Sequence, residues 1–260
     1  MKKTLSIMLI LASAMMLLAG CGSKKSDNKF IVGFDADFPP YGYMDDAGEY
    51  VGFDLDLAQE VCSRRGWEYV AQPIDWDSKD MELSSGNISC IWNGFTMSED
   101  RIDSYEWSTP YVDNSQVFVV AKDSGVTTQD QLAGLTVAVQ TASSALEALE
   151  SEDCADLTAS FAELTVVPDY NTAFLNLESG AVDAIAMDIG VANYQCEQRD
   201  GAYVVLDEPI VSEQYGIGFL KGNTELRDQV QETLDEMAED GTFMEIAKKW
   251  GLEDCATLGK

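Results

Sequence analysis

The sequence contains no histidine among its 260 residues. This absence excludes a Ser-His-Asp triad, a Cys-His nucleophile pair and every metal site built on imidazole. Basic residues are scarce, because 16 lysines and arginines stand against 46 aspartates and glutamates, a formal net charge of −30. Such a surface repels nucleic acid and is not attracted to anionic lipid. We therefore expect no nucleic-acid partner, no metal and no cofactor.

Cysteine is present, but not in a spacing typical of metal or redox sites. None of the six cysteines forms a Cys-x-x-Cys pair, and their spacings match no zinc pattern. Five remain after Cys21, and five cannot all pair. Cys62 falls on the apolar face of an expected helix and Cys90 in an apolar strand, so we expect buried free thiols there. A bridge between Cys154 and Cys196 is left open.

The one long apolar run lies at the N-terminus. Two lysines precede a mostly apolar stretch, 5–18, that is too short to span a bilayer comfortably, so residues 1–20 are expected to be a signal peptide. Leu18-Ala19-Gly20-Cys21 resembles a bacterial lipobox, in which the cysteine takes a diacylglyceryl group. Cys21 with the polar tether in 21–28 would then anchor the chain to the outer face of the cell membrane. Ordinary secretion with a coincidental cysteine is the alternative.

The rest of the chain alternates strand and helix patterns. Short apolar runs such as 30–34 predict buried strands, and 53–65 predicts a helix with an apolar stripe and Gly66 as its stop signal. The alternation predicts a parallel α/β sheet, and the pattern restarts near residue 135. Each of the two runs carries polar residues at carboxyl strand ends, where open α/β sheets bind ligands. The sequence therefore predicts two lobes with a cleft between them.

The stretch 92–101 has the composition of a carboxylate site. An apolar strand leads into Asn93-Gly94, Thr96 and Ser98 supply hydroxyls, and Arg101 stands at the start of a short helix. Backbone N–H groups, a hydroxyl and a rigid guanidinium are the donors that a small carboxylate requires. We interpret this stretch as half of a site for a free amino acid.

Six motifs in a fixed order give the chain a family resemblance. They are Phe-Asp-x-x-Phe-Pro-Pro-Tyr (34–41), Gly-Phe-Asp-x-Asp-Leu (52–57), Asp-Trp-Asp-Ser (75–78), Asn-Gly-Phe-Thr-x-Ser-x-x-Arg (93–101), Ala-Val-Asp-Ala-x-x-x-Asp (181–188) and Gln-Tyr-Gly-Ile-Gly-Phe (214–219). With these motifs the sequence resembles the polar amino-acid family of bacterial extracellular solute-binding proteins, family 3, which serve ABC importers; the glutamine- and histidine-binding proteins are examples.

The resemblance implies an α/β fold of the two-lobed, type II periplasmic-binding-protein class. Two hinge strands would cross between the lobes near 114–119 and 213–217. The first lobe would comprise 29–115 plus 216–260, and the second 116–215. Closure on a free amino acid would form the complex that an ABC permease and its ATPase recognise. We expect an extracytoplasmic monomer that is not an enzyme.

The resemblance also assigns roles to individual residues that would bind the ligand's carboxylate and ammonium groups. Arg101 matches the arginine that binds the ligand's α-carboxylate, and Asp188 matches the aspartate that pairs with its α-ammonium group. Thr96 would donate beside Arg101, while Gly94 or Asn93 would offer a carbonyl to the ammonium. Simple helix capping is the alternative for Thr96 and Asp188.

The second lobe and the walls of the cleft complete the expected site. Ser143 and Ser144 match a turn whose N–H groups and hydroxyl reach the carboxylate, although Ala142 replaces the usual glycine and restricts φ. Phe38 and Trp76 match aromatic positions on either side of the ligand's side chain, with core packing as the alternative.

Two further positions bear on the ligand's side chain. Asp35 matches a position that accepts from a distal amide or cation, and Gln140 replaces the lysine of the glutamine-type relative. With no second basic residue assigned to the cleft, a neutral-polar or basic amino acid is expected rather than glutamate or aspartate.

Two other functions remain open. The same fold is known to host a cyclohexadienyl or arogenate dehydratase, for which Asp188 or Asp35 would be the general acid. The chain could also be an amino-acid sensor subunit. A carboxylate-plus-ammonium site favours binding without catalysis.

Overall fold

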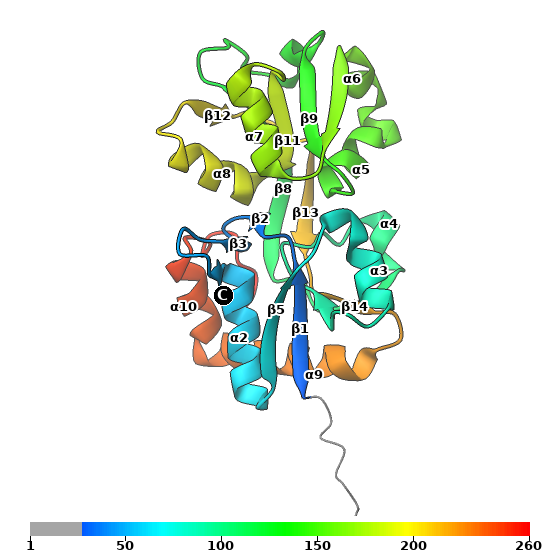
Figure 1. Cartoon of the computed structure of the whole chain (residues 1–260), viewed down its shortest axis with the longest axis vertical. Coiled ribbons are helices and arrows are strands. Elements are labelled where there is room, and N and C mark those ends of the chain that lie inside the picture. Colours follow the sequence, from blue (N-terminus) through cyan, green and yellow to red (C-terminus); the bar gives the residue numbers. More distant parts are fainter. Residues whose placement is uncertain (1–27) are drawn as a thin grey trace, which may run out of the picture.

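The computed structural model describes residues 28–260, which form two lobes joined by two strands (Figure 1). The expectations for the signal peptide 1–20, for Cys21 and for nearly all of the tether lie outside the described residues. Across residues 28–260, no helix is both long and apolar enough to cross a membrane.

The first lobe is built on a five-stranded sheet in the order β5-β1-β6-β14-β7. The strands are β1 (Lys29–Phe34), β5 (Glu68–Pro73), β6 (Cys90–Ile91), β7 (Tyr105–Trp107) and β14 (Gly218–Leu220). β1 runs parallel to β5 and β6, whereas β14 runs antiparallel to β6 and β7. The predicted parallel sheet is therefore wrong in one strand: the late strand β14 enters this sheet in the opposite direction.

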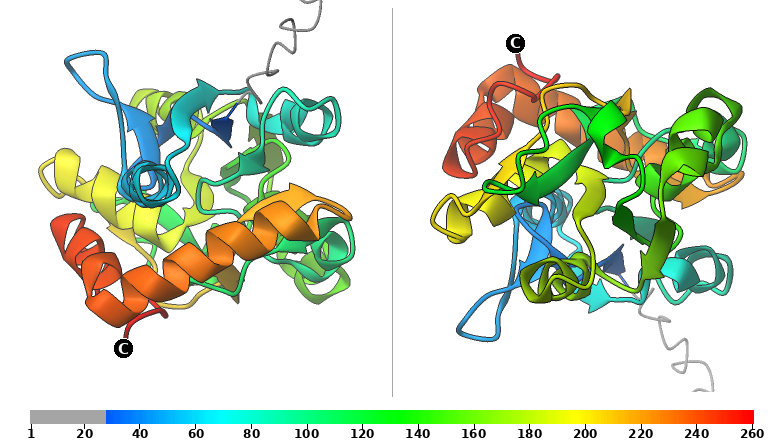
Figure 2. Two further views of the ribbon diagram at one scale, coloured as in Figure 1. Left: turned by 90° about the horizontal axis from the view of Figure 1, so that it is seen from below. Right: turned by 90° about the horizontal axis from the view of Figure 1, so that it is seen from above.

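Helix α2 (Phe53–Arg65) has the bounds that the sequence predicts. Its buried stripe includes Leu57, Val61 and Cys62, and Gly66 ends it in the left-handed conformation with φ 68°. The C-terminal helices α9 (Thr224–Asp240) and α10 (Thr242–Lys249) pack against α2 in the same lobe (Figure 2). On the cleft side lie the short helices α3 (Lys79–Ser84) and α4 (Glu99–Ile102), the 3-10 turn η1 (Trp76–Ser78), and a small sheet of β2 (Asp37–Phe38), β3 (Gly42–Met44) and β4 (Tyr50–Val51).

The second lobe is built on a sheet in the order β10-β9-β11-β8-β12. Its strands are β8 (Val112–Ala121), β9 (Thr136–Gln140), β10 (Glu163–Val167), β11 (Ala184–Asp188) and β12 (Tyr203–Val205). Its helices are α5 (Ser144–Glu150), α6 (Ala155–Ser160), α7 (Tyr170–Ser179) and α8 (Ile189–Gln198), with 3-10 turns η2 (Gln129–Leu132) and η3 (Glu152–Cys154). β8 runs antiparallel to β11, so this sheet is also mixed.

Two antiparallel strands, β8 and β13 (Val211–Tyr215), connect the lobes (Figure 1). Their register pairs Val112 with Tyr215 and Gln116 with Val211. The second hinge crossing is expected near 213–217; the structure has β13 as a hinge strand and β14 as a separate strand of the first lobe. Because β13 ends at Tyr215, we propose 29–115 plus 216–260 and 116–215 as the lobe boundaries.

The described cysteines are all free thiols. Cys62 and Cys90 are buried as expected, and burial raises the pKa of Cys62 to about 12. Cys154 and Cys196 are also free, so the bridge left open between them is excluded.

Candidate ligand-binding site

Nine of the predicted residues line one narrow cavity between the lobes. Those from the first lobe are Phe38, Trp76, Gly94, Thr96 and Arg101, and those from the second are Gln140, Ser143, Ser144 and Asp188. The strand-end residues among them follow β6, β9 and β11, as expected for an open α/β sheet. The cavity holds about 10 Å³, which is room for about one water molecule. An amino acid could therefore enter only after the lobes move apart.

Arg101 is buried in the cleft and binds residues of the other lobe. Its Nε and Nη2 atoms lie 2.9 and 2.5 Å from Oε1 of Glu147 on α5, and Nη2 also donates to the carbonyl of Ala142 at 3.1 Å. The guanidinium carbon lies 5.1 Å from the centre of the Phe95 ring. Among the described residues, these bonds use Nε and Nη2 of Arg101 and leave its Nη1 atom available to a ligand. The sequence does not assign Glu147 to the cleft.

Asp188 ends β11 and lies 3% exposed at the cleft. Although it occupies the cap position of α8, its side chain makes no capping bond. Its Oδ1 atom instead accepts from Asn114, Gln116 and the hydroxyl of Tyr215, at 2.8, 2.6 and 2.6 Å. Burial and the neighbouring charge of Glu213 raise the pKa of Asp188 to about 7. The capping alternative for this residue is therefore not what the structure shows.

Glu213 is a second carboxylate at the cleft, and no pattern in the sequence assigns it to the site. It lies on β13, and its Oε1 atom accepts from Thr96 at 2.7 Å and from Ser144 at 3.3 Å. The hydroxyl oxygens of Thr96 and Ser144 also lie 3.1 Å apart, so hydroxyls from both lobes meet at this carboxylate.

A buried aspartate, Asp54, forms a hydrogen bond with the loop that carries Gly94. Oδ2 of Asp54 accepts from the Gly94 N–H at 2.6 Å and from the Tyr111 hydroxyl at 2.8 Å. Burial raises the pKa of Asp54 to about 7. Gly94 has φ 58°, and a Cβ atom there would lie 2.8 Å from the Phe38 ring, so glycine fits this position for two reasons.

The two serine hydroxyls of the turn that enters α5 have different partners. Ser143 caps α5 by accepting from the Leu146 N–H at 3.1 Å, and its hydroxyl donates to the Gln140 carbonyl at 2.8 Å. The Ser143 hydroxyl is therefore already bonded within the second lobe, whereas that of Ser144 bonds Glu213 on the hinge strand and Thr96 across the cleft.

Two predicted site residues, Asp35 and Asn93, do not line this cavity. Asn93 accepts from the Asp35 N–H at 3.0 Å and so supports the loop after β1. Asp35 accepts from Gln140 of the other lobe at 2.7 Å. Burial is the main cause that raises the pKa of Asp35 to about 6, and the charges of Asp37 and Asp169 add to it.

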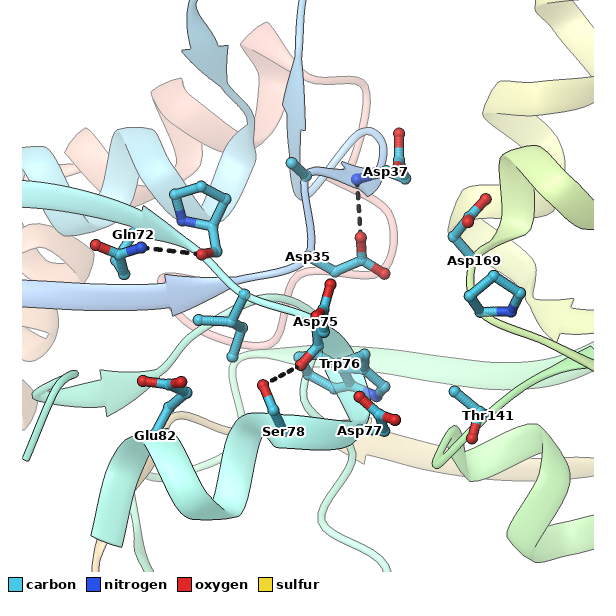
Figure 3. Close-up of a pocket in the computed structure, with 14 residues that line it drawn as sticks. Asp35, Asp37, Gln72, Asp75, Trp76, Asp77, Ser78, Glu82, Thr141 and Asp169 are labelled. Carbon is cyan, nitrogen blue, oxygen red and sulfur yellow. Dashed lines mark hydrogen bonds between the residues drawn. The ribbon is translucent and has the colours of Figure 1, made fainter. Parts of the chain in front are cut away.

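A larger pocket of about 640 Å³ adjoins the narrow cavity, and Trp76 lines both (Figure 3). Its wall is strongly acidic, with Asp35, Asp37, Asp75, Asp77, Glu82 and Asp169 among the lining residues. Asp169 and Thr141 reach it from the second lobe, and the other labelled residues come from the first (Figure 3). Such a wall favours a cationic or hydrogen-bond-donating group.

Lys79 is a second buried basic residue close to the cleft. It is 5% exposed, its Nζ atom lies 3.5 Å from the Ala142 carbonyl, and it lies 5.4 Å from the centre of the Trp76 ring. Burial and the charge of Arg101 lower its pKa. Lys79 lines neither the narrow cavity nor the acidic pocket.

No group of three or more metal-ligating side chains occurs within residues 28–260. The narrow cavity is lined by one cationic side chain, Arg101, and one acidic side chain, Asp188, and Glu213 lies next to it.

The comparisons with known proteins agree with this geometry. The family model of the bacterial extracellular solute-binding proteins, family 3, matches residues 30–253. The chain belongs to this family. It is 28% identical to the L-cystine-binding protein TcyJ of Escherichia coli over 87% of the chain and 84% of that protein. It is 30% identical to the ABC transporter glutamine-binding protein GlnH of Bacillus subtilis, covering 98% of the chain and all of that protein.

A solved structure supports the same fold. An ABC uptake transporter substrate-binding protein from Streptococcus pneumoniae with bound histidine superimposes with a TM-score of 0.84 at 34% identity, covering 89% of this chain and 96% of that one. The type II periplasmic-binding-protein fold predicted from sequence is confirmed, and the family places this solute-binding protein outside the cytoplasm.

Proposed function

We propose that this solute-binding protein holds a free L-amino acid between its lobes and presents it to an ABC permease with its ATPase. The observation that carries the proposal is the pair of opposite charges, Arg101 and Asp188, that line one buried cavity. A zwitterionic backbone needs one cationic and one anionic partner. The named ligands of the similar proteins, cystine, glutamine and histidine, are all amino acids, which supports this ligand class.

A neutral-polar or basic side chain is proposed for the amino acid. The side chain would pass Trp76, which lines both spaces, towards the acidic pocket with Asp35 and Asp169. A carboxylate there would meet several negative charges. Lys79 does not line that pocket, so it does not reverse the preference.

The expected affinity follows from a few strong contacts. Charge-assisted hydrogen bonds contribute about 1.5–3 kcal/mol each, and a handful of them with aromatic burial would give about micromolar binding, near −8 kcal/mol. Because the cavity holds only about 10 Å³, part of this free energy must separate contacts that now join the lobes.

A thermal-shift screen against the twenty amino acids, cystine and ornithine tests the proposal, followed by calorimetry of the best compound. Arg101→Ala should weaken binding by at least about a hundredfold, since it removes the cation for the carboxylate. Arg65→Ala is the matched control, because Arg65 pairs with Glu232 on the exposed side of the first lobe. Normal binding by a folded Arg101→Ala protein would refute the assignment.

Membrane attachment is the second part of the proposal. The lipobox-like sequence ending at Cys21 supports lipidation of this thiol. The acidic surface offers no attraction to anionic lipid, so attachment to the membrane would depend on the lipid chain. Metabolic labelling with palmitate should mark the wild-type protein and leave Cys21→Ser unlabelled. Equal labelling of the two proteins would contradict lipidation at Cys21.

A dehydratase of the same fold is the second candidate, because Asp188 and Asp35 are both buried with raised pKa values of about 7 and about 6. A carboxylic acid that holds its proton near neutral pH fits a general acid. Incubation with arogenate and with prephenate decides the matter: product formation would establish the enzyme, and we expect none.

A further inference from the structure

Two carboxylates at the hinge share the same hydrogen-bond donors. The Asn114 amide nitrogen lies 2.8 Å from Oδ1 of Asp188 and 2.7 Å from Oε1 of Glu213. The Gln116 amide nitrogen lies 2.6 and 2.7 Å from the same two atoms. Both amides belong to hinge strand β8, and Glu213 belongs to hinge strand β13. The two acidic groups are therefore close neighbours at the point where the lobes are joined.

The surroundings of this pair hold more acceptors than donors. Oδ1 of Asn114 and Oε1 of Gln116 are buried and have no hydrogen-bond partner in the described part of the chain. The two side chains are 4% and 0% exposed. Buried carbonyl oxygens are nearly always paired, so two unpaired ones beside two carboxylates indicate a place for a group with several N–H donors. An ammonium group has three such donors and a positive charge.

The negative charge of Asp188 and Glu213 also favours a cationic group between them. Two buried like charges are unfavourable unless a cation or a proton joins them. The titratable groups that face Asp188 are Glu213 and Tyr215 on β13, with Tyr41 and Tyr170 from the surrounding elements. Burial raises the pKa of all three tyrosines well above the usual value, so they stay neutral. A proton on the pair therefore has to be held by the carboxylates themselves.

Glu213 also adjoins the narrow cavity. Thr96 and Ser144 line the cavity together with Asp188, and both donate to Oε1 of Glu213, at 2.7 and 3.3 Å. A group bound between Thr96, Ser144 and Asp188 would thus lie next to Glu213.

We propose that Glu213 is a second anionic ligand for the amino acid's α-ammonium group, beside Asp188, and that binding displaces a proton shared by the two carboxylates. The ammonium takes the place of that proton, and the free carbonyl oxygens of Asn114 and Gln116 offer acceptors for its third N–H group. The proton goes to solvent, so capture of the amino acid becomes dependent on pH near neutrality. The inference rests on the proposed function, because it assigns further residues to the same site.

Calorimetry in two buffers of different ionisation enthalpy, phosphate and Tris at pH 7, tests the inference. The titrant is whichever of L-arginine, L-glutamine and L-histidine most raises the melting temperature. The wild-type protein should release about half a proton for each amino acid bound, since burial and the charge of Glu213 raise the pKa of Asp188 to about 7. Glu213→Gln keeps the shape of the side chain and should reduce this release to less than about one fifth of a proton, with a Kd about tenfold higher.

Glu208→Gln is the matched control, because Glu208 is exposed, and it should leave both values unchanged. A Glu213→Gln protein that binds with the wild-type Kd and the wild-type proton release would overturn the inference while leaving the proposed function intact. If none of the three amino acids binds the wild-type protein and the wider screen is also negative, the proposed function itself fails, and the inference fails with it.

Discussion

Ala142 has a left-handed backbone conformation, with φ 52°, at the turn that leads into α5. This conformation costs a residue with a Cβ atom about 1–2 kcal/mol. The turn is nevertheless formed, and its carbonyl accepts from Arg101 at 3.1 Å and lies 3.5 Å from Lys79. Alanine at this position therefore has the left-handed geometry that glycine favours, and contacts from the other lobe help to hold it there.

Ala142→Gly should raise the free energy of unfolding by up to about 1 kcal/mol, because glycine relieves the left-handed strain and this gain exceeds the added entropy of the unfolded chain. Urea unfolding measures the change. Ala148→Gly, in the middle of α5, is the control and should lower stability by about 1 kcal/mol. A loss of stability in Ala142→Gly equal to that of the control would show that the turn carries no strain.

At the scale of elements, α4 and α5 are joined across the cleft by the ion pair of Arg101 and Glu147. Ser98 adds a bond to the other carboxylate oxygen of Glu147 at 3.0 Å. These contacts stabilise an arrangement whose cavity has room for about one water molecule. The protein therefore has a closed form held by its own carboxylate, and an amino acid must compete with that form.

Glu147→Gln should lower the Kd of the amino acid about fivefold, because losing roughly 1 kcal/mol from the closed form increases the fraction of chains open for binding. Titration calorimetry gives the value. Glu150→Gln, an exposed residue on the same helix, should change nothing. A higher Kd in Glu147→Gln would instead mean that Glu147 orients Arg101 in the bound state.

Elements with a strong local pattern were predictable from the residues themselves, whereas hinge strand β13 was expected near 213–217 only through the family resemblance. Helix α2 has an apolar stripe, an acidic first turn and a glycine stop, and these signals fixed its bounds. β13 has no apolar run, because most of its residues are polar and partly or fully exposed. Its place depends on pairing with β8, about a hundred residues earlier in the chain.

The site residues show the same contrast between what the sequence motifs predict and what contacts between distant segments determine. Residues inside family motifs, such as Arg101 and Asp188, were placed at the cavity by resemblance, although their binding roles stay predictions. Glu147 and Glu213 lie outside those motifs, and their positions arise from contacts between distant segments, for example Thr96 with Glu213 at a separation of 117 residues. No spacing along the sequence reports such a contact.

At the scale of the whole molecule, three buried aspartates favour the protonated form in the folded state. Burial raises the pKa values of Asp35, Asp54 and Asp188 to about 6, 7 and 7. In the unfolded chain each returns to about 4. Between these values the folded state binds more protons than the unfolded state, so stability is greatest at the acidic end of this range and falls as pH rises through 6 to 7.

The ligand-free protein should therefore be more stable at pH 5.5 than at pH 8, by at least about 2 kcal/mol. The large negative charge adds to the trend, because self-repulsion grows as carboxyls ionise. Urea unfolding at the two pH values measures the difference. Asp54→Asn should reduce it by removing one of the three groups. Equal stability at both pH values would contradict the assignment of protons to these carboxyls.

The strand order of the first lobe has a consequence for the order in which the chain folds. β14 lies between β6 and β7 in the sheet, although it is made more than a hundred residues after them. Apart from the hinge, the second lobe is one continuous segment that is complete before β14 is synthesised. Until β14 is made, β6 and β7 lack the strand that joins them, and such unpaired edges invite association with other chains. Until the last forty residues arrive, the first lobe depends on remaining unfolded or protected during export.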